Sequence, residues 1–180
     1  MEEEEDEKKA APEINLRPFE FSDLDDFMTW ASDDRIMRVS HRPTCATAED
    51  ALAHLKDLIL PHPWYRAICV GGRAVGCVSV TPAAGRDVHR ASIGYGVAYA
   101  YWGRGIATAA VRKAASAVFA EWPQLKRLEA VAEESNRASQ RVLQKAGFQR
   151  EGLLRSYVVL RGESKDVVMY SLLSTDPKVQ

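Results

Sequence analysis

Two glycines separated by one arginine lie at the centre of the stretch YWGRGIATAAV, residues 101–111. The alanine-rich segment that follows them favours a helix. A glycine loop that opens onto a helix N-terminus can hold phosphate, because backbone N–H groups converge, no Cβ blocks the approach and the helix dipole favours an anion. Gly103 and Gly105 therefore predict either a phosphate site or a simple turn between a strand and a helix.

The same loop is one residue short of the dinucleotide fingerprint GxGxxG, read from Gly103 to Thr108. Glu129, at the end of the next expected strand, stands where an acid would meet a ribose hydroxyl. Against this interpretation, four residues separate the preceding strand from Gly103, and the loop follows a hairpin instead of opening a βαβ unit. An NAD(P)-dependent enzyme is therefore the weaker alternative.

Composition excludes several classes of protein and of site. The 180 residues are 46% hydrophobic, which suits one domain with its own core. No apolar run reaches the roughly 18 residues of a membrane helix, and no Lys/Arg-dense run typical of nucleic-acid binding occurs. Cys45, Cys69 and Cys77 lack CxxC spacing and the four histidines form no ligand motif. We therefore expect no membrane or nucleic-acid partner, no metal site and no Cys/His nucleophile.

The N-terminus carries a block of like charge. Residues 2–7 are six consecutive carboxylates, and two lysines follow them. Such a block cannot be buried, so residues 1–10 are expected to form a disordered acidic tail and residues 11–180 a single domain. The 22 basic and 19 acidic side chains of that domain give it a charge of about +3. The acidic start is unlike a signal peptide, so the expected location is the cytoplasm, with the nucleus as a second option.

Apolar periodicity and turn residues predict the elements that position the loop. The expected strands are residues 13–19, 64–70, 74–80, 89–99, 125–132, 148–160 and 166–173. The expected helices are residues 22–32, 47–60, 106–122 and 135–147. Ser22 and Thr47 are the predicted N-caps of the first two helices, and Leu52, Leu55 and Ile59 the predicted apolar face of the second. This order predicts a mixed sheet covered by helices.

Two blocks together carry a family resemblance. VAYAYWGRGIATAAV, residues 97–111, followed by NRASQRVLQKAGF, residues 136–148, resembles the GNAT superfamily of acyl-CoA-dependent N-acyltransferases, and within it the Rim-type ribosomal-protein N-terminal acetyltransferases. The family's loop signature, Gln/Arg-x-x-Gly-x-Gly/Ala, is matched at Gly105 and Ala107, whereas Trp102 departs from it. The second block matches at Asn136, Ser139, Lys145, Gly147 and Phe148.

The resemblance covers about residues 14–172 and implies a GNAT-like α/β fold, whose mixed, mostly antiparallel central sheet has helices on both faces. It implies acetyl-CoA as co-substrate and an N-acetyltransferase that moves the acetyl group to a primary amine by direct attack on the thioester. The acceptor would be a protein N-terminus or a small amine, and the protein a monomer or homodimer. A non-catalytic acyl-CoA sensor or adaptor is the alternative from another class.

By the same resemblance, the CoA pyrophosphate lies on the glycine loop and the pantetheine arm lies at the end of the fourth strand. The implied CoA-binding residues are Val97, Tyr99, Trp102, Gly103, Arg104, Gly105, Ile106, Ala107, Thr108, Asn136 and Ser139. Val97 would offer its N–H to the acetyl oxygen. Tyr99 is alternatively an ordinary aromatic residue at a strand end, and Asn136 a helix N-cap.

The chemical roles are assigned less directly. Ser139 is the expected acid for the leaving thiolate, since the tyrosine that many relatives carry seven residues after the Asn is Leu143 here. Tyr157 is a weaker substitute for that acid. Glu129 is the candidate base, or else a surface charge on a strand. A water chain to solvent would also serve as base.

Acceptor contacts are expected from the first two helices and the last two strands. Aromatic residues there suggest either an acceptor pocket or core: Trp30, Trp64, Tyr65 and Tyr157. A polyamine site would need converging carboxylates, for which the candidates are Asp23, Asp25, Asp26, Asp33 and Asp34. Asp23 and Asp25 are alternatively residues of a helix start, where the dipole favours negative charge.

Overall fold

The computed structural model describes residues 12–37 and 45–177, so the expected acidic tail lies outside the described residues. One seven-stranded sheet runs through the molecule in the order β1-β2-β3-β4-β5-β7-β6. Its strands are β1 (Asn15–Pro18), β2 (Tyr65–Val70), β3 (Arg73–Pro82), β4 (Arg90–Val97), β5 (Arg127–Glu133), β6 (Gln149–Leu160) and β7 (Glu163–Leu173). Every neighbouring pair is antiparallel except the parallel pair β4–β5, which confirms the predicted mixed, mostly antiparallel sheet.

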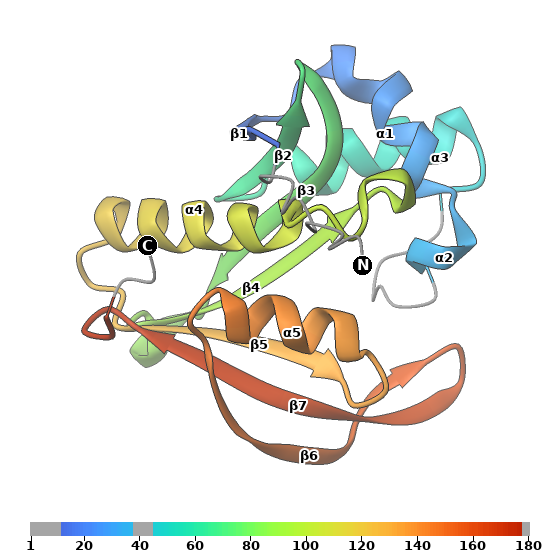
Figure 1. Ribbon diagram of the computed structural model, residues 1–180. Coiled ribbons are helices and arrows are strands. Elements are labelled where there is room, and N and C mark those ends of the chain that lie inside the picture. Colours follow the sequence, from blue (N-terminus) through green and yellow to red (C-terminus); the bar gives the residue numbers. More distant parts are fainter. Residues whose placement is uncertain (1–11, 38–44, 178–180) are drawn as a thin grey trace, which may run out of the picture.

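Helices pack on both faces of this sheet (Figure 1). They are α1 (Leu24–Ala31), α2 (Asp34–Met37), α3 (Ala48–His54), continued by a π-helical turn over Leu55–Ile59, α4 (Ile106–Glu121) and α5 (Arg137–Lys145). Short 3-10 turns cover Phe21–Asp23, Gly85–Asp87 and Tyr99–Tyr101. α1 and α3 share one apolar cluster with β2 and β3, and α4 and α5 share the other with strands from β2 to β7.

One predicted N-cap is confirmed and the other is wrong. Thr47 caps α3 in a reciprocal pair, its Oγ1 accepting from the Asp50 N–H at 3.1 Å and its own N–H donating to the Asp50 carboxylate at 3.0 Å. Ser22 instead lies inside the 3-10 turn that precedes α1. Glu20 and Asp23 cap this turn reciprocally, the Glu20 N–H donating to the Asp23 carboxylate at 2.9 Å, so the helical segment begins before Ser22.

The predicted apolar face of the second helix is partly wrong. Leu55 and Ile59 are buried as expected, but Leu52 is 41% exposed. Ala51 takes its place against α1 and is fully buried. A methyl side chain lets the two helices approach closely, and this packing turns Leu52 toward solvent.

The sheet divides between β4 and β5. Only Arg90–Ser92 of β4 pair with Arg127–Glu129 of β5, and the two strands then separate as they run to Val97 and Glu133 (Figure 1). The strands are parallel, so their carboxyl ends lie at the same edge. α4 follows β4 and α5 follows β5, and both helices therefore begin at the open end of this gap.

Candidate active site at the gap between β4 and β5

The N-terminus of α4 is uncapped. Gly103 and Gly105 have φ of 74° and 75°, which glycine adopts without strain. Gly105 is the N-cap, contributes no side-chain hydrogen bond, and no acidic residue occupies the first helical turn. The first bond of the helix runs from the Ala109 N–H to the Gly105 carbonyl at 3.0 Å. The N–H groups of residues 106–108 therefore point out of a 16-residue helix, which makes an anion site.

Positive side chains lie on the loop before α4 and along α5. The Arg104 guanidinium lies 5.2 Å from the centre of the Tyr101 ring. On α5, Arg137, Arg141 and Lys145 are exposed and recur every four residues, so they form one stripe. α5 contains no acidic residue. The combined field favours a ligand with several negative charges.

The hydrogen-bond ladder determines which β4 groups face the gap. The Ala83 N–H donates to the Arg90 carbonyl at 3.0 Å and the Ala98 N–H to the Val75 carbonyl at 2.8 Å. Residues of an antiparallel strand alternate between bonding their neighbour and turning away from it. Between these two bonds, Tyr95 and Val97 therefore turn their N–H and C=O groups away from β3, toward the gap. The Val97 carbonyl accepts from Trp102 Nε1 at 2.6 Å, so the Val97 N–H faces the gap as the expected donor would.

The first turn of α5 brings three side chains together. Asn136 Oδ1 accepts from the Ser139 N–H at 3.0 Å, so Asn136 is the N-cap. Its Nδ2 makes no hydrogen bond to any described residue and remains able to bind a ligand. The Tyr95 hydroxyl lies 2.7 Å from Ser139 Oγ, where either oxygen can be the donor, and 3.1 Å from the Ser139 carbonyl oxygen, which can only accept. Burial raises the pKa of Tyr95 to about 12.

Tyr95 is absent from the residues singled out in the sequence. The signal was available: Ile93, Tyr95 and Val97 alternate along β4, and Ile93 and Val97 are buried against α4 and α5. Tyr95 is thus a polar residue on an otherwise apolar face. Such a group needs a partner, but nothing local identified Ser139 as that partner.

The structure does not bring the other two candidate catalytic residues to Ser139. Glu129 points to the sheet face opposite α5, because its neighbours Leu128 and Ala130 are buried beneath the helices. There its carboxylate pairs with Arg127 at 2.7 Å and with Arg90 at 3.3 Å. Tyr157 lies on the edge strand β6 and is 55% exposed. Their assigned roles remain predictions, without support from this arrangement.

Of the residues expected around the acceptor, the tryptophans belong to the apolar core and most of the aspartates form ion pairs. Trp30 and Trp64 are only 2% exposed and belong to the two apolar clusters. The described aspartates largely pair with arginine instead of converging: Asp23 with Arg17 at 2.6 Å, Asp26 with Arg73 at 2.8 Å and Asp33 with Arg35 at 2.6 Å. This arrangement gives no support to a polyamine site.

Tyr99 lies at the border of a charged cavity. Its ring is stacked beneath the Arg35 guanidinium, 3.7 Å from the ring centre, and lies 5.0 Å from the Trp102 ring, centre to centre. The cavity has a volume of about 350 Å³, and Asp26, Asp33 and Arg73 also line it. Tyr99 is therefore partly engaged within the chain and 47% exposed.

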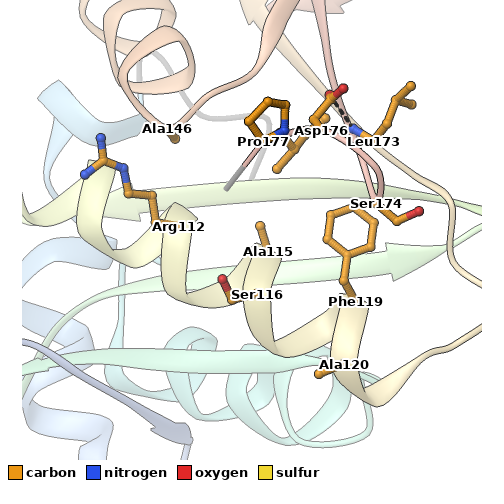
Figure 2. A pocket seen from close by; sticks show the side chains of 11 residues that line it. Arg112, Ala115, Ser116, Phe119, Ala120, Ala146, Leu173, Ser174, Asp176 and Pro177 are labelled. Carbon is orange, nitrogen blue, oxygen red and sulfur yellow. Dashed lines mark hydrogen bonds between the residues drawn. The ribbon is translucent and has the colours of Figure 1, made fainter. Parts of the chain in front are cut away.

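A second cavity lies beside α4 (Figure 2). It measures about 270 Å³ and lies between α4 and the turn that follows β7, with Phe119 and Asp176 on opposite sides. It shares no residue with the glycine loop or the first turn of α5. It is therefore separate from the candidate active site.

Comparison with known proteins decides the family. The model of the acetyltransferase (GNAT) domain matches residues 13–149. The chain belongs to the GNAT acetyltransferase family. The uncharacterized N-acetyltransferase p20 of Bacillus licheniformis is 30% identical to this GNAT chain over 169 residues, which are 91% of this chain and 94% of the relative.

Solved structures agree with this assignment. RimJ of Mycobacterium smegmatis, in complex with CoA-disulfide, is 26% identical, with a TM-score of 0.77 over 91% of this chain and 83% of that one. The ribosomal-protein-S5-alanine acetyltransferase of Vibrio fischeri shares the fold at 23% identity, with a TM-score of 0.76 over 91% and 94% of the two chains. The predicted GNAT fold and the Rim-type resemblance are confirmed, and the protein is an N-acetyltransferase.

Two further findings concern what the described part of the chain lacks. No described helix is both long and apolar enough to cross a membrane. No group of three or more His, Cys, Asp or Glu side chains within residues 12–37 and 45–177 could hold a metal ion.

Proposed function

We propose that this GNAT domain binds acetyl-CoA across the open end of the β4–β5 gap and transfers its acetyl group to a primary amine. One observation carries the proposal: the uncapped N-terminus of α4 opens beside the same gap that the Val97 N–H faces. A phosphate-bearing ligand and an extended arm would thus find their sites next to each other. RimJ, which has the same fold, is in complex with CoA-disulfide.

The residues present suit CoA. The pyrophosphate would accept from the N–H groups of residues 106–108, with no Cβ on Gly103 or Gly105 in its way. The stripe Arg137, Arg141 and Lys145 would attract the remaining phosphate. Edge groups of Tyr95 and Val97 and the Asn136 Nδ2 would bind the amides of the arm.

Each chemical task then falls to a named group. When bound, acetyl-CoA supplies an activated acetyl group. The Val97 N–H stabilises the negative charge that develops on the acetyl oxygen. The Ser139 hydroxyl donates to the leaving sulfur. Arg90 and Arg127 hold the Glu129 carboxylate, so we propose that water in the gap, and not Glu129, removes the proton of the amine.

A protein N-terminus is the acceptor that we propose first, because the Rim-type likeness extends over most of the chain. A small amine is second. A non-catalytic acyl-CoA sensor is the competing function, since Leu143, at the position of the usual tyrosine, is fully buried and cannot act as an acid. Ser139→Ala separates these functions: an enzyme loses turnover and keeps its affinity for CoA, whereas a sensor has no turnover to lose.

The first test is thermal unfolding with acetyl-CoA, CoA, NADH and NADPH. A ligand at a hundred times its Kd adds about 2.7 kcal/mol to the free energy of unfolding. Acetyl-CoA and CoA should raise Tm and the nicotinamides should not. Mass spectrometry of peptides and small amines incubated with acetyl-CoA then identifies the acceptor. An unchanged Tm with acetyl-CoA would contradict the proposal.

A further inference from the structure

We propose that Tyr95 is a positioning residue for the transfer reaction: its hydroxyl holds Ser139 Oγ so that the Ser139 proton points at the leaving sulfur. This inference rests on the proposed function, in which Ser139 serves as the acid. It assigns a role to a residue of β4 that lies 44 positions before Ser139 in the sequence.

Geometry joins Tyr95 to Ser139. The two hydroxyl oxygens are 2.7 Å apart, whereas the Tyr95 oxygen lies 3.1 Å from the Ser139 carbonyl. A phenol has one proton, so Tyr95 donates either to the hydroxyl or to the carbonyl. The shorter contact favours donation to Ser139 Oγ. In that arrangement the Ser139 proton is free to point away from Tyr95.

The backbone restricts the remaining directions. The Ser139 N–H is already bound by Asn136 Oδ1 at 3.0 Å, which fixes the first turn of α5. Tyr95, on the sheet face that α4 and α5 cover, and Ser139, on α5, are both partly buried. Without Tyr95, the Ser139 hydroxyl would be free to bond back to a carbonyl of its own helix. Tyr95 thus selects the orientation that leaves a proton for a ligand in the gap.

Tyr95 itself keeps its proton through the reaction. Burial raises its pKa to about 12, far above neutral pH, so it remains a hydrogen-bond donor. Tyr95 neither gives up nor takes a proton in the transfer step. As the C–N bond forms and the C–S electron pair moves to sulfur, water in the gap takes the proton that the acceptor nitrogen loses, and Ser139 Oγ gives its own proton to sulfur. The same water then returns a proton to Ser139 Oγ. Ser139 ends the step uncharged, and the products are the amide and the thiol.

The test compares Tyr95→Phe and Ser139→Ala, singly and together. Tyr95→Phe removes one oxygen and keeps the ring. Each change should lower kcat about 10- to 100-fold, because each one loses the hydrogen bond that Ser139 aims at the negative charge on the leaving sulfur. The Kd for acetyl-CoA should change little. Because the two residues act as one unit, the double variant should lose little more than the worse single variant.

A second measurement does not depend on turnover. In the complex with free CoA, a Ser139 proton aimed at sulfur stabilises the thiolate and lowers the pKa of the bound thiol. The ultraviolet absorbance of the thiolate follows this titration. Tyr95→Phe and Ser139→Ala should each raise that pKa. Tyr170→Phe is the matched control, since it removes another buried tyrosine hydroxyl, which donates to Gln140 of α5 at 3.3 Å, and should change neither quantity.

The outcomes separate the two proposals. Failure of CoA to bind the unaltered protein would remove the proposed function. If CoA binds and Ser139→Ala acts as expected, but Tyr95→Phe keeps the normal kcat and thiol pKa, Tyr95 has no positioning role. Tyr95→Phe could also lower Tm and weaken CoA binding while the pKa of the bound CoA thiol stays unchanged. That result would show that Tyr95 has a purely structural role, and it would overturn the inference as well.

Discussion

The indole Nε1 of Trp102 donates a hydrogen bond to the Val97 carbonyl over 2.6 Å. This bond ties the glycine loop to the end of β4, where the Val97 N–H faces the gap. Trp102 occupies the position at which the family signature has Gln or Arg. The departure therefore has a structural purpose in this chain: an aromatic donor replaces a polar side chain and fixes the end of the strand.

Trp102→Phe should keep the ring near Tyr99 and remove that bond. We expect the free energy of unfolding to fall by about 0.5–1.5 kcal/mol and kcat to fall with it, because the Val97 peptide is no longer fixed. Trp122→Phe, at the other end of α4, is the control for loss of an indole. Equal kcat in the two variants would contradict the role assigned to Trp102. Denaturant unfolding and steady-state kinetics measure both effects.

Thr108→Asp should change stability and ligand binding in opposite directions. Thr108 lies in the first turn of α4, where a carboxylate favours the helix dipole, by about 0.3–1 kcal/mol. The same charge repels a phosphate. We expect Tm of the free protein to hold or rise and the Tm increase on adding acetyl-CoA to be lost. Thr108→Asn, which lacks the charge, should retain that increase; its loss in both variants would point to shape and not to an anion site.

Two substitutions should separate the capping role of Asn136 from its role in CoA binding. Asn136→Asp keeps the oxygen that caps α5 and removes the Nδ2 donor, so stability should persist while the Kd for CoA rises. Asn136→Ala removes both, at a cost of about 1 kcal/mol in the free energy of unfolding. Thermal unfolding and calorimetry with CoA distinguish the cases. Unchanged CoA affinity in Asn136→Asp would leave Asn136 as a cap only.

Gly76→Ala should destabilise the sheet next to the active site. A Cβ built on Gly76 lies 2.3 Å from the Gly96 carbonyl oxygen and 3.0 Å from the Val97 Cα, so β3 and β4 must move apart. We expect a loss of about 1–3 kcal/mol and weaker CoA binding. Gly94→Ala is the control on the same strand pair, because its Cβ meets only Ser79 Oγ at 3.7 Å. Similar losses in both would show that the close approach is not the cause.

Acid should weaken one ion pair that joins β5 to β6. Arg127 and the Ser171 hydroxyl bind Glu151 and lower its pKa from 4.5 to about 2. A carboxyl with a lowered folded-state pKa stabilises the protein above pH 4.5, and this contribution disappears as the pH falls toward 2. Glu151 is partly exposed, so its contribution is under about 1 kcal/mol. Glu151→Gln should be less stable at pH 7 and equal to the unaltered protein near pH 2. A stability difference independent of pH would contradict this account.

Most of the local structure could be predicted from the sequence. Apolar periodicity located the strands and the four main helices, and the pairs Gly71–Gly72 and Arg161–Gly162 located two hairpin turns. Thr47 was correctly predicted as a cap, because a capping residue acts within one turn of chain. The errors at Ser22 and Leu52 arose where a competing neighbour, Asp23 or Ala51, was better suited to the same position.

The sequence by itself determined the family, the glycine loop and the uncapped start of α4, because turn chemistry and helix ends depend on residues a few positions apart. Only the tertiary structure decided which distant groups meet. Tyr95 and Ser139 are brought together because the first turn of α5 reaches the Tyr95 side chain of β4, and Glu129 is turned away because the register of β5 puts Leu128 and Ala130 under the helices. Strand pairing and face assignment depend on contacts between segments far apart in the chain, and no short stretch of residues encodes them.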